Sequence, residues 1–143
     1  MALATDMTRF EVKPIGWVSS DLKGLDSVPR QAEEGTPEVW LVFDLELLEG
    51  LQALQLGDRI LVLTWLDRTR RDMLRVHPRG DAPRPLEGVF RTHAPHRPNP
   101  LGPHSVEITA IEDVRLRIRH LEALDGTPII DVKPILNAEV SRR

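Results

Sequence analysis

The sequence has no cysteine and no tyrosine, only three lysines, and no long hydrophobic run. Without cysteine the chain forms neither a disulfide nor a thiolate zinc site, which fits a reducing compartment, and we predict a cytoplasmic protein. No apolar run approaches the ~20 residues that a membrane span needs, so we expect no membrane partner. The N-terminus lacks a basic region followed by an apolar block, which argues against a secretory signal. Walker A and G-x-G-x-x-G phosphate loops are also missing.

The length of 143 residues suits one domain, which we place at residues 10–143 after a loose tail at 1–9. The net charge of −3 argues against a protein that coats nucleic acid wholesale, although it leaves room for a local basic patch. Sixteen of the nineteen cationic residues are arginine. The planar guanidinium suits phosphate and stacked bases, but a GC-rich genome would produce the same bias.

Short apolar segments predict six or seven strands and one short helix. Glu38–Leu45 alternates apolar and polar residues, as a half-buried strand does, whereas Arg59–Leu66 is almost continuously apolar and predicts a strand buried on both faces. Leucines at helical spacing in Glu46–Leu56 predict one or two turns of helix. Further strands are expected at 10–18, 88–91, 104–110, 114–120 and 129–132. We therefore predict an all-β fold, a compact barrel or sandwich with long Pro/Gly-rich loops.

The stretch Phe90–Val106 holds four of the twelve prolines and three of the five histidines. Each proline fixes its own φ and removes a backbone donor, which argues against both a helix and a central strand. We expect a stiff, extended loop that presents polar side chains. These side chains are Arg91, His93, His96, Arg97, Asn99 and His104.

Several chemistries can be weighed for this loop. His93 and His96 lie in an extended, proline-containing segment, which does not place two imidazoles on one face, so a metal site is disfavoured. A Ser-His-Asp hydrolase lacks its G-x-S-x-G turn. Arg97 can bind an anion, Asn99 can read a purine edge, and Asp125, in a predicted tight turn, can accept a hydrogen bond from a ribose hydroxyl or an ammonium group.

The polar, proline-rich segment Asp67–Glu87 is slightly basic. It can be a solvated loop, or it can be an arm that contacts phosphates beside the site.

The run Gly88–Gly102, GVFRTHAPHRPNPLG, resembles the signature of the TsaA-like (TrmO-type) family, whose usual form is GVFATRSPFRPNPIG. Three further pieces of the family pattern follow the same order: PIG at 14–16, PRQ at 29–31 and LDGTPIIDVKP at 124–134. His93 stands where the family has arginine, and His104 follows Pro103 where the family has Leu-Ser or Met-Ser. The resemblance covers nearly the whole chain.

The resemblance implies a compact β-barrel that binds S-adenosyl-L-methionine and works as a homodimer. The enzymes of the family methylate N6 of threonylcarbamoyladenosine beside the anticodon of tRNA. This chain is then a tRNA methyltransferase without a separate C-terminal domain; the alternatives are a barrel that methylates another substrate and a non-catalytic cofactor-binding module. The catalytic base is left open among His93, His96 and Asp131. The expected cofactor contacts are Pro29, Arg30, Gln31, His93, Arg97, Asn99, His104, Leu124, Asp125, Gly126 and Thr127.

Overall fold

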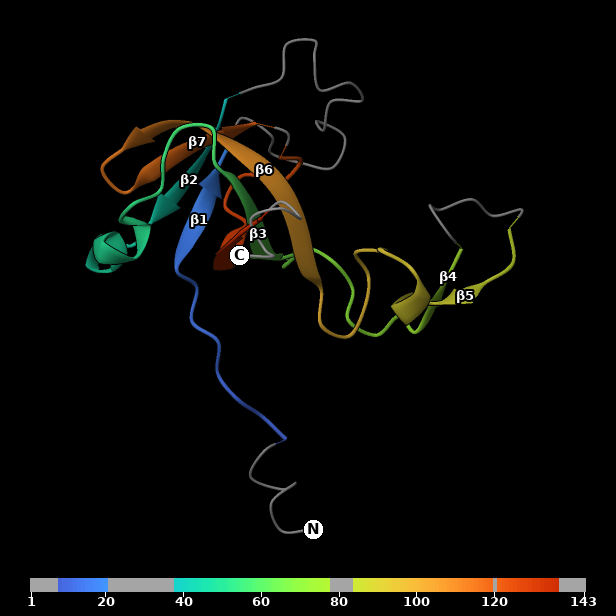
Figure 1. Cartoon of the computed structure of the whole chain (residues 1–143). Helices are drawn as coiled ribbons and strands as arrows, with labels where there is room; N and C mark the ends of the chain where they lie inside the picture. The colour runs from blue at the N-terminus through green and yellow to red at the C-terminus, as the bar shows by residue number, and fades with distance from the viewer. Residues whose placement is uncertain (1–7, 21–37, 78–83, 120, 137–143) are drawn as a thin grey trace.

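A closed antiparallel sheet of six strands forms the body of the computed structural model, which describes residues 8–20, 38–77, 84–119 and 121–136 (Figure 1). The strands follow one another around the sheet in the order β1-β2-β7-β6-β3-β8, and the sheet closes because β8 pairs with both β3 and β1. Their bounds are Gly16–Ser19 (β1), Val39–Phe43 (β2), Arg59–Trp65 (β3), Leu101–Glu112 (β6), Arg115–Arg119 (β7) and Pro128–Pro134 (β8).

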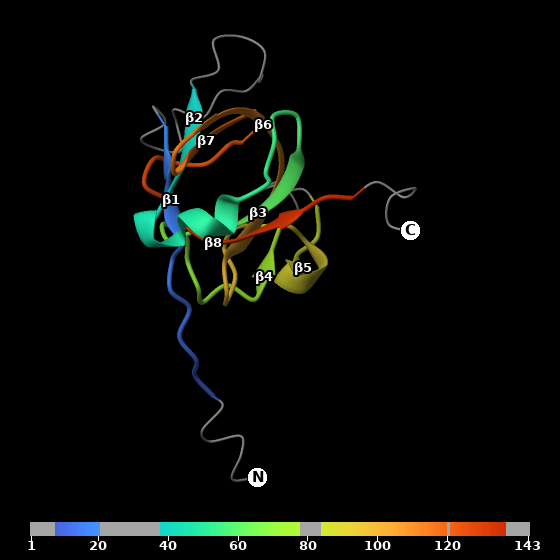
Figure 2. The same cartoon turned by 60° about the vertical axis from the view of Figure 1, so that its left-hand side comes forward.

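A small two-stranded ribbon forms outside this sheet. It pairs β4 (Arg75–Val76) with β5 (Glu87–Gly88) and continues into a one-turn 3-10 helix, η4 (Val89–Arg91). The ribbon projects to one side of the closed sheet in Figure 1, and in the view of Figure 2 it lies below β3 and β8. Among the described residues, no helix is long and apolar enough to span a membrane.

The core lies inside the closed sheet because alternate strand residues point inward. Leu41, Val62, Val106, Leu116 and Ile129 are completely buried. Burial of each such aliphatic side chain contributes about 1.5–3 kcal/mol, so this interior is the main stabilising feature. The prediction of a mostly β structure is therefore confirmed, as is the alternating pattern expected for β2.

Three predicted elements differ in detail. The inner residues of β3 are buried, but its outer residues are only half-buried, so burial on both faces is wrong. The predicted helix at 46–56 is a 3-10 helix, η2 (Leu45–Leu51), and only Leu51 and Leu54 pack against the core. The predicted strand at 10–18 is ordered as β1 only from Gly16, and Phe10 is 83% exposed.

The proline-rich stretch also departs from prediction. Its start is not a strand at 88–91, because only Gly88 belongs to β5 and a 3-10 turn follows. Its end is not a loop, because β6 begins at Leu101 and runs through Pro103 beside β3. This strand tolerates Pro103 because β7 pairs with β6 only from Glu107 onward, so at Pro103 the side of the strand away from β3 has no β7 partner.

Candidate functional site

Three segments meet at one end of the closed sheet, where β3 ends and where β6 and β8 begin. Pairing of Trp65 with Leu101, and of Thr64 with Ile129, sets this arrangement. The loop at 66–71 therefore lies beside both the loop at 92–100 and the turn at 124–127. Backbone hydrogen bonds of 2.8 Å from Leu66 N to Pro100 O and 3.0 Å from Arg97 N to Arg70 O join the two loops. Arg68 Nη2 donates to Asp125 O at 2.8 Å and joins the first loop to the turn.

Arg97 holds the proline-rich loop in shape. Its Nη1 donates to Thr92 O at 2.9 Å and to Ala94 O at 3.1 Å, and its Nη2 donates to Val89 O at 3.0 Å. A guanidinium that binds neutral carbonyls makes charge-assisted bonds, which are stronger than neutral ones. Arg97 thus ties together the backbone at Val89, Thr92 and Ala94 and holds the loop in one shape.

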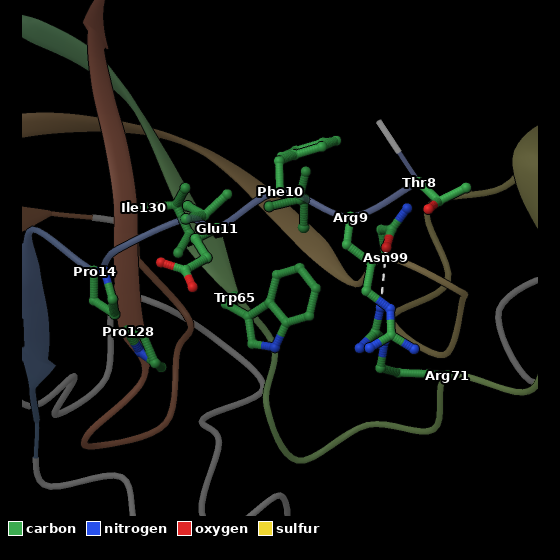
Figure 3. A pocket seen from close by; sticks show the side chains of 12 residues that line it. Thr8, Arg9, Phe10, Glu11, Pro14, Trp65, Arg71, Asn99, Pro128 and Ile130 are labelled. Atoms are coloured by element: carbon green, nitrogen blue, oxygen red, sulfur yellow. Dashed lines mark hydrogen bonds between the residues drawn. The ribbon is translucent and has the colours of Figure 1, made fainter. Parts of the chain in front are cut away.

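His96 and Asn99 of the same loop are held by the neighbouring loop. Arg70 N donates to His96 Nδ1 at 2.9 Å. Arg71 Nε donates to Pro98 O at 2.6 Å, and Arg71 Nη2 donates to Asn99 Oδ1 at 3.1 Å, as Figure 3 shows. The Arg71 guanidinium also lies 5.1 Å from the centre of the Trp65 ring, at cation–π distance.

The turn at 124–127 is tight, as predicted, and Gly126 has a φ of +85°. Thr127 Oγ1 donates to Leu124 O at 2.6 Å, which fixes the turn. Ser20 N donates to Asp125 Oδ1 at 2.8 Å. The other carboxylate oxygen, Oδ2, accepts no hydrogen bond from the part of the chain that the structure describes, so it can accept one from a ligand.

His104 lies on the inner side of β6 and contacts Thr64 of β3, with 2.8 Å between its Nε2 and the Thr64 Oγ1. Burial lowers the pKa of the His104 imidazole, because a low-dielectric environment disfavours the charged form. Gly102 makes room for this pair, since a Cβ there would lie 2.8 Å from both His104 Nε2 and Thr64 Oγ1. Burial therefore favours the neutral form of the imidazole.

The described residues include eight of the eleven predicted contacts. His93 is exposed on the 92–100 loop, whereas Pro29, Arg30 and Gln31 lie outside the described residues. Within the described ranges, no group of three metal-ligating side chains comes together.

An open cavity of about 1120 Å³ adjoins this end, between the N-terminal segment and the outer side of β3 and β8 (Figure 3). It includes Asn99 from the predicted set. Trp65 and Arg71 were not among the predicted site residues, although a tryptophan at the end of an apolar strand, followed by an arginine-rich loop, indicated a binding surface. The side chains that line the cavity include Phe10, Glu11, Trp65, Arg71, Asn99 and Leu101.

A closed β-sheet with a stiffened loop and an acidic glycine turn at one end is a scaffold suited to binding a small molecule. The chain belongs to the tRNA-methyltransferase O N-terminal domain family, whose sequence model matches residues 17–139. The predicted TsaA-like membership is thereby confirmed.

Relatives of two kinds match the chain. It is 44% identical over 124 residues to an S-adenosyl-L-methionine-binding protein of Archaeoglobus fulgidus, with 85% of this chain and 86% of that protein covered. It is 42% identical to a probable S-adenosyl-L-methionine-binding protein of Methanothermobacter thermautotrophicus, covering 86% and 88%. The crystal structure of TrmO from Pseudomonas aeruginosa matches with a TM-score of 0.69 and 27% identity over 90% of this chain, which spans 56% of the solved chain.

Proposed function

We propose that this protein binds S-adenosyl-L-methionine at the end of the closed sheet and methylates N6 of threonylcarbamoyladenosine in tRNA. The observation that carries the proposal is the junction of the 92–100 loop, the 66–71 loop and the Asp125 turn, made by the Arg97 and Arg68 hydrogen bonds. Two of these segments, the 92–100 loop and the Asp125 turn, lie within the family motifs. In this proposal the closed sheet is a compact barrel and the protein is a homodimer, as the resemblance implies. The chain length favours a single domain, and the lack of cysteine favours a cytoplasmic location.

The groups present fit the cofactor. S-adenosyl-L-methionine carries a sulfonium, an ammonium and ribose hydroxyls, and when bound it supplies an activated methyl group. Asp125 offers a carboxylate oxygen that has no partner among the described residues, and this oxygen can accept from an ammonium or a hydroxyl. Burial lowers the pKa of His104 and favours its neutral form, which adds no repulsive charge next to a cationic ligand.

The chain's own contribution is alignment. Arg97 fixes the loop through three carbonyl oxygens, and Arg68 fixes that loop's neighbour against the Asp125 turn. Rigid placement of donor and acceptor atoms can supply several kcal/mol of a transfer barrier, about 7–11 kcal/mol at most. A side chain that holds a loop in this way stabilises the reactive geometry without touching the reacting atoms.

The acceptor nitrogen must release a proton during methyl transfer. The three candidate bases, His93, His96 and Asp131, differ in whether their acceptor atoms are already occupied by hydrogen bonds or ion pairs. His96 Nδ1 already accepts from Arg70 N. Asp131 Oδ1 accepts from Val132 N, and its other oxygen lies 4.0 Å from Lys133 Nζ. The exposed His93 ring makes no hydrogen bond with the described residues, so in this proposal His93 accepts the proton.

Calorimetric titration with S-adenosyl-L-methionine tests the binding step. Asp125→Asn keeps the shape and removes the charge, and loss of a charged hydrogen bond of about 1.5–3 kcal/mol weakens binding by roughly 10- to 150-fold. Asp113→Asn is the matched control, because this residue lies in the turn between β6 and β7 with a φ of +51°, which asparagine tolerates. Absence of binding heat with the unaltered protein would refute the proposal.

The transfer step is tested by incubating the protein with methyl-labelled cofactor and total tRNA, then digesting the tRNA to nucleosides. Label in N6-methylated threonylcarbamoyladenosine is the expected result. The names and lengths of the archaeal relatives favour one alternative, a binding protein without transferase activity, because they match over 86–88% of their length and are named for binding alone. Tight binding with no label in any RNA supports that alternative, whereas label in another nucleoside indicates a different substrate.

A further inference from the structure

Positively charged residues are concentrated in the stretch of sequence that connects β3 to β6. Residues 67–100 contain eight arginines and four acidic residues, whereas the whole chain has a net charge of −3. The remainder of the molecule is therefore acidic. Such an asymmetry directs a polyanion to one part of the surface even though the net charge is negative.

The β4–β5 ribbon, with the η4 turn that follows it, projects to one side of the acidic body in the view of Figure 1. We call the described residues 74–76 and 87–91 the arm. Register places Arg75 opposite Gly88, and Val89 N donates to Leu74 O at 2.9 Å. Arg97 Nη2 donates to Val89 O, so the arm is fixed at its base to the 92–100 loop. The arm is therefore joined to one of the loops that form the candidate site.

The arm exposes one aromatic ring together with two arginines. Phe90 is 80% exposed, and the Arg91 side chain is 83% exposed. Arg91 Nε lies 3.9 Å from Glu87 Oε2, and an exposed pair at that distance contributes little. Arg75 makes no hydrogen bond or ion pair with the described residues. The Phe90 ring does not pack against the buried core, so the core gives no reason for an aromatic residue at this position.

Arg70 differs from Arg75 and Arg91, because its guanidinium is already paired within its own loop. Its guanidinium binds Asp72 at 2.8 Å, and this hydrogen bond lowers the pKa of the Asp72 carboxyl. Arg70 is thus occupied within its own loop, whereas Arg75 and Arg91 keep most of their donors available for an anion. An exposed aromatic ring on the same short ribbon as available guanidinium groups is the combination that binds unpaired nucleotides, with a base stacked on the ring and phosphates at the cations.

We propose that the arm is an RNA-binding surface, on which Phe90 stacks an unpaired base and Arg75 and Arg91 bind the adjoining phosphates. The inference rests on the proposed function for the identity of the RNA and deepens it, by assigning to the arm the task of holding nucleotides beside the modified one. A second copy of the chain is the competing occupant of the arm. The excess of positive charge and the unpaired state of Arg75 favour the polyanion.

Fluorescence anisotropy without cofactor tests the arm with two RNA probes of equal length, a hairpin with an unpaired adenosine-containing loop and a fully paired duplex. Phe90→Ala removes stacking, so hairpin affinity falls roughly 5- to 100-fold while duplex affinity is unchanged. The double variant Arg75→Glu/Arg91→Glu weakens both probes and reduces the slope of log K against log salt by about two, one for each phosphate contact. Because all three side chains are exposed, these variants are expected to keep the thermal unfolding midpoint of the unaltered protein.

Arg59→Glu is the matched control for charge. Arg59 begins β3 at the end remote from the arm, where its Nη2 donates to Ser105 Oγ. It is expected to leave RNA affinity nearly unchanged. Equal RNA affinity for the arm variants and the unaltered protein would overturn the inference. So would variants that shift a dimer to monomer in sedimentation but bind RNA normally, which would assign the arm to an interface between copies.

Failure of the inference and failure of the proposed function are distinguishable. Protein that binds S-adenosyl-L-methionine in calorimetry but neither RNA probe refutes the arm and leaves the cofactor site standing. Protein that binds the hairpin through Phe90 but gives no heat with the cofactor supports the arm and refutes the methyltransferase.

Discussion

Replacement of Gly16 by alanine should destabilise the closed sheet, because two backbones cross closely at this residue. An added Cβ would lie 2.3 Å from Val42 O and 2.9 Å from the Cα of Phe43. Carbon and carbonyl oxygen in favourable contact are about 3.3–3.6 Å apart, so β1 and β2 must separate by roughly 1 Å. The obstacle is backbone on both sides, and no side-chain rotation relieves it.

The surroundings of Gly16 prevent an easy shift. Ile15 N donates to Ile129 O at 2.8 Å, and Asp44 N donates to Ile15 O at 2.9 Å, so the strand is tied to β8 on one side and to the end of β2 on the other. Overpacking of about 1–3 kcal/mol adds to the loss of about two hydrogen bonds at ~1 kcal/mol each. The expected destabilisation is about 3–5 kcal/mol, a large part of the 5–15 kcal/mol typical of a domain.

Urea unfolding followed by tryptophan fluorescence measures this loss, and the m-value should stay unchanged if the unfolded state is unaffected. Gly50→Ala is the matched control, because no atom lies within 4 Å of its added Cβ and its φ is not positive. It should be neutral or stabilising by up to about 1 kcal/mol. A Gly16→Ala protein within 1 kcal/mol of the unaltered one would refute the close-crossing argument.

Three further predictions concern the site. Burial lowers the pKa of His104 in the folded protein, so the unfolded chain takes up a proton there at a higher pH. As pH falls from 7.5 to 5, the unaltered protein should therefore lose stability relative to His104→Gln, by at most ~1.4 kcal/mol per pH unit. Urea unfolding measures this difference in stability, and a difference that stays constant with pH would contradict the prediction. Arg97→Lys cannot reach three carbonyl groups at once, so cofactor affinity in calorimetry should fall about tenfold or more, while far-UV circular dichroism of the closed sheet is retained; unchanged affinity would exclude the positioning role. Gly126→Ala places a Cβ at a φ of +85° and should lower the free energy of unfolding by about 1–2 kcal/mol in thermal or urea unfolding, and no loss would show that the turn relaxes.

Local patterns predicted the features that depend on neighbouring residues alone. The alternation in Glu38–Leu45 predicted an inward and an outward face, and the structure buries Val39, Leu41 and Phe43 as expected. The prediction is wrong at Leu45, which begins η2 and is exposed. The Asp125-Gly126-Thr127 sequence predicted a tight turn with a positive φ at the glycine, and this is confirmed. Both succeed because side-chain alternation and turn geometry are set within a few residues.

Predictions that depended on partners in space were less accurate. Proline in Leu101–Val106 argued against a central strand, yet β6 includes this segment, because only β3 pairs with it at that level. The role of Arg97 was also undetermined, because a guanidinium can bind a carboxylate, a phosphate or backbone carbonyl groups, and local sequence does not say which of them lies within reach. Local propensity does not say which edge of a strand lacks a neighbour.

The sequence by itself determined the β class, the glycine turn and, through its family motifs, the class of ligand, because each is encoded in short stretches of residues. Three features become visible only in the folded chain. They are the closure of the sheet, the joining of three distant segments through Arg68 and Arg97, and the projection of the arm from an acidic body. Each of these depends on contacts between residues far apart in the chain, and such contacts exist only once strand register and loop packing have been fixed together.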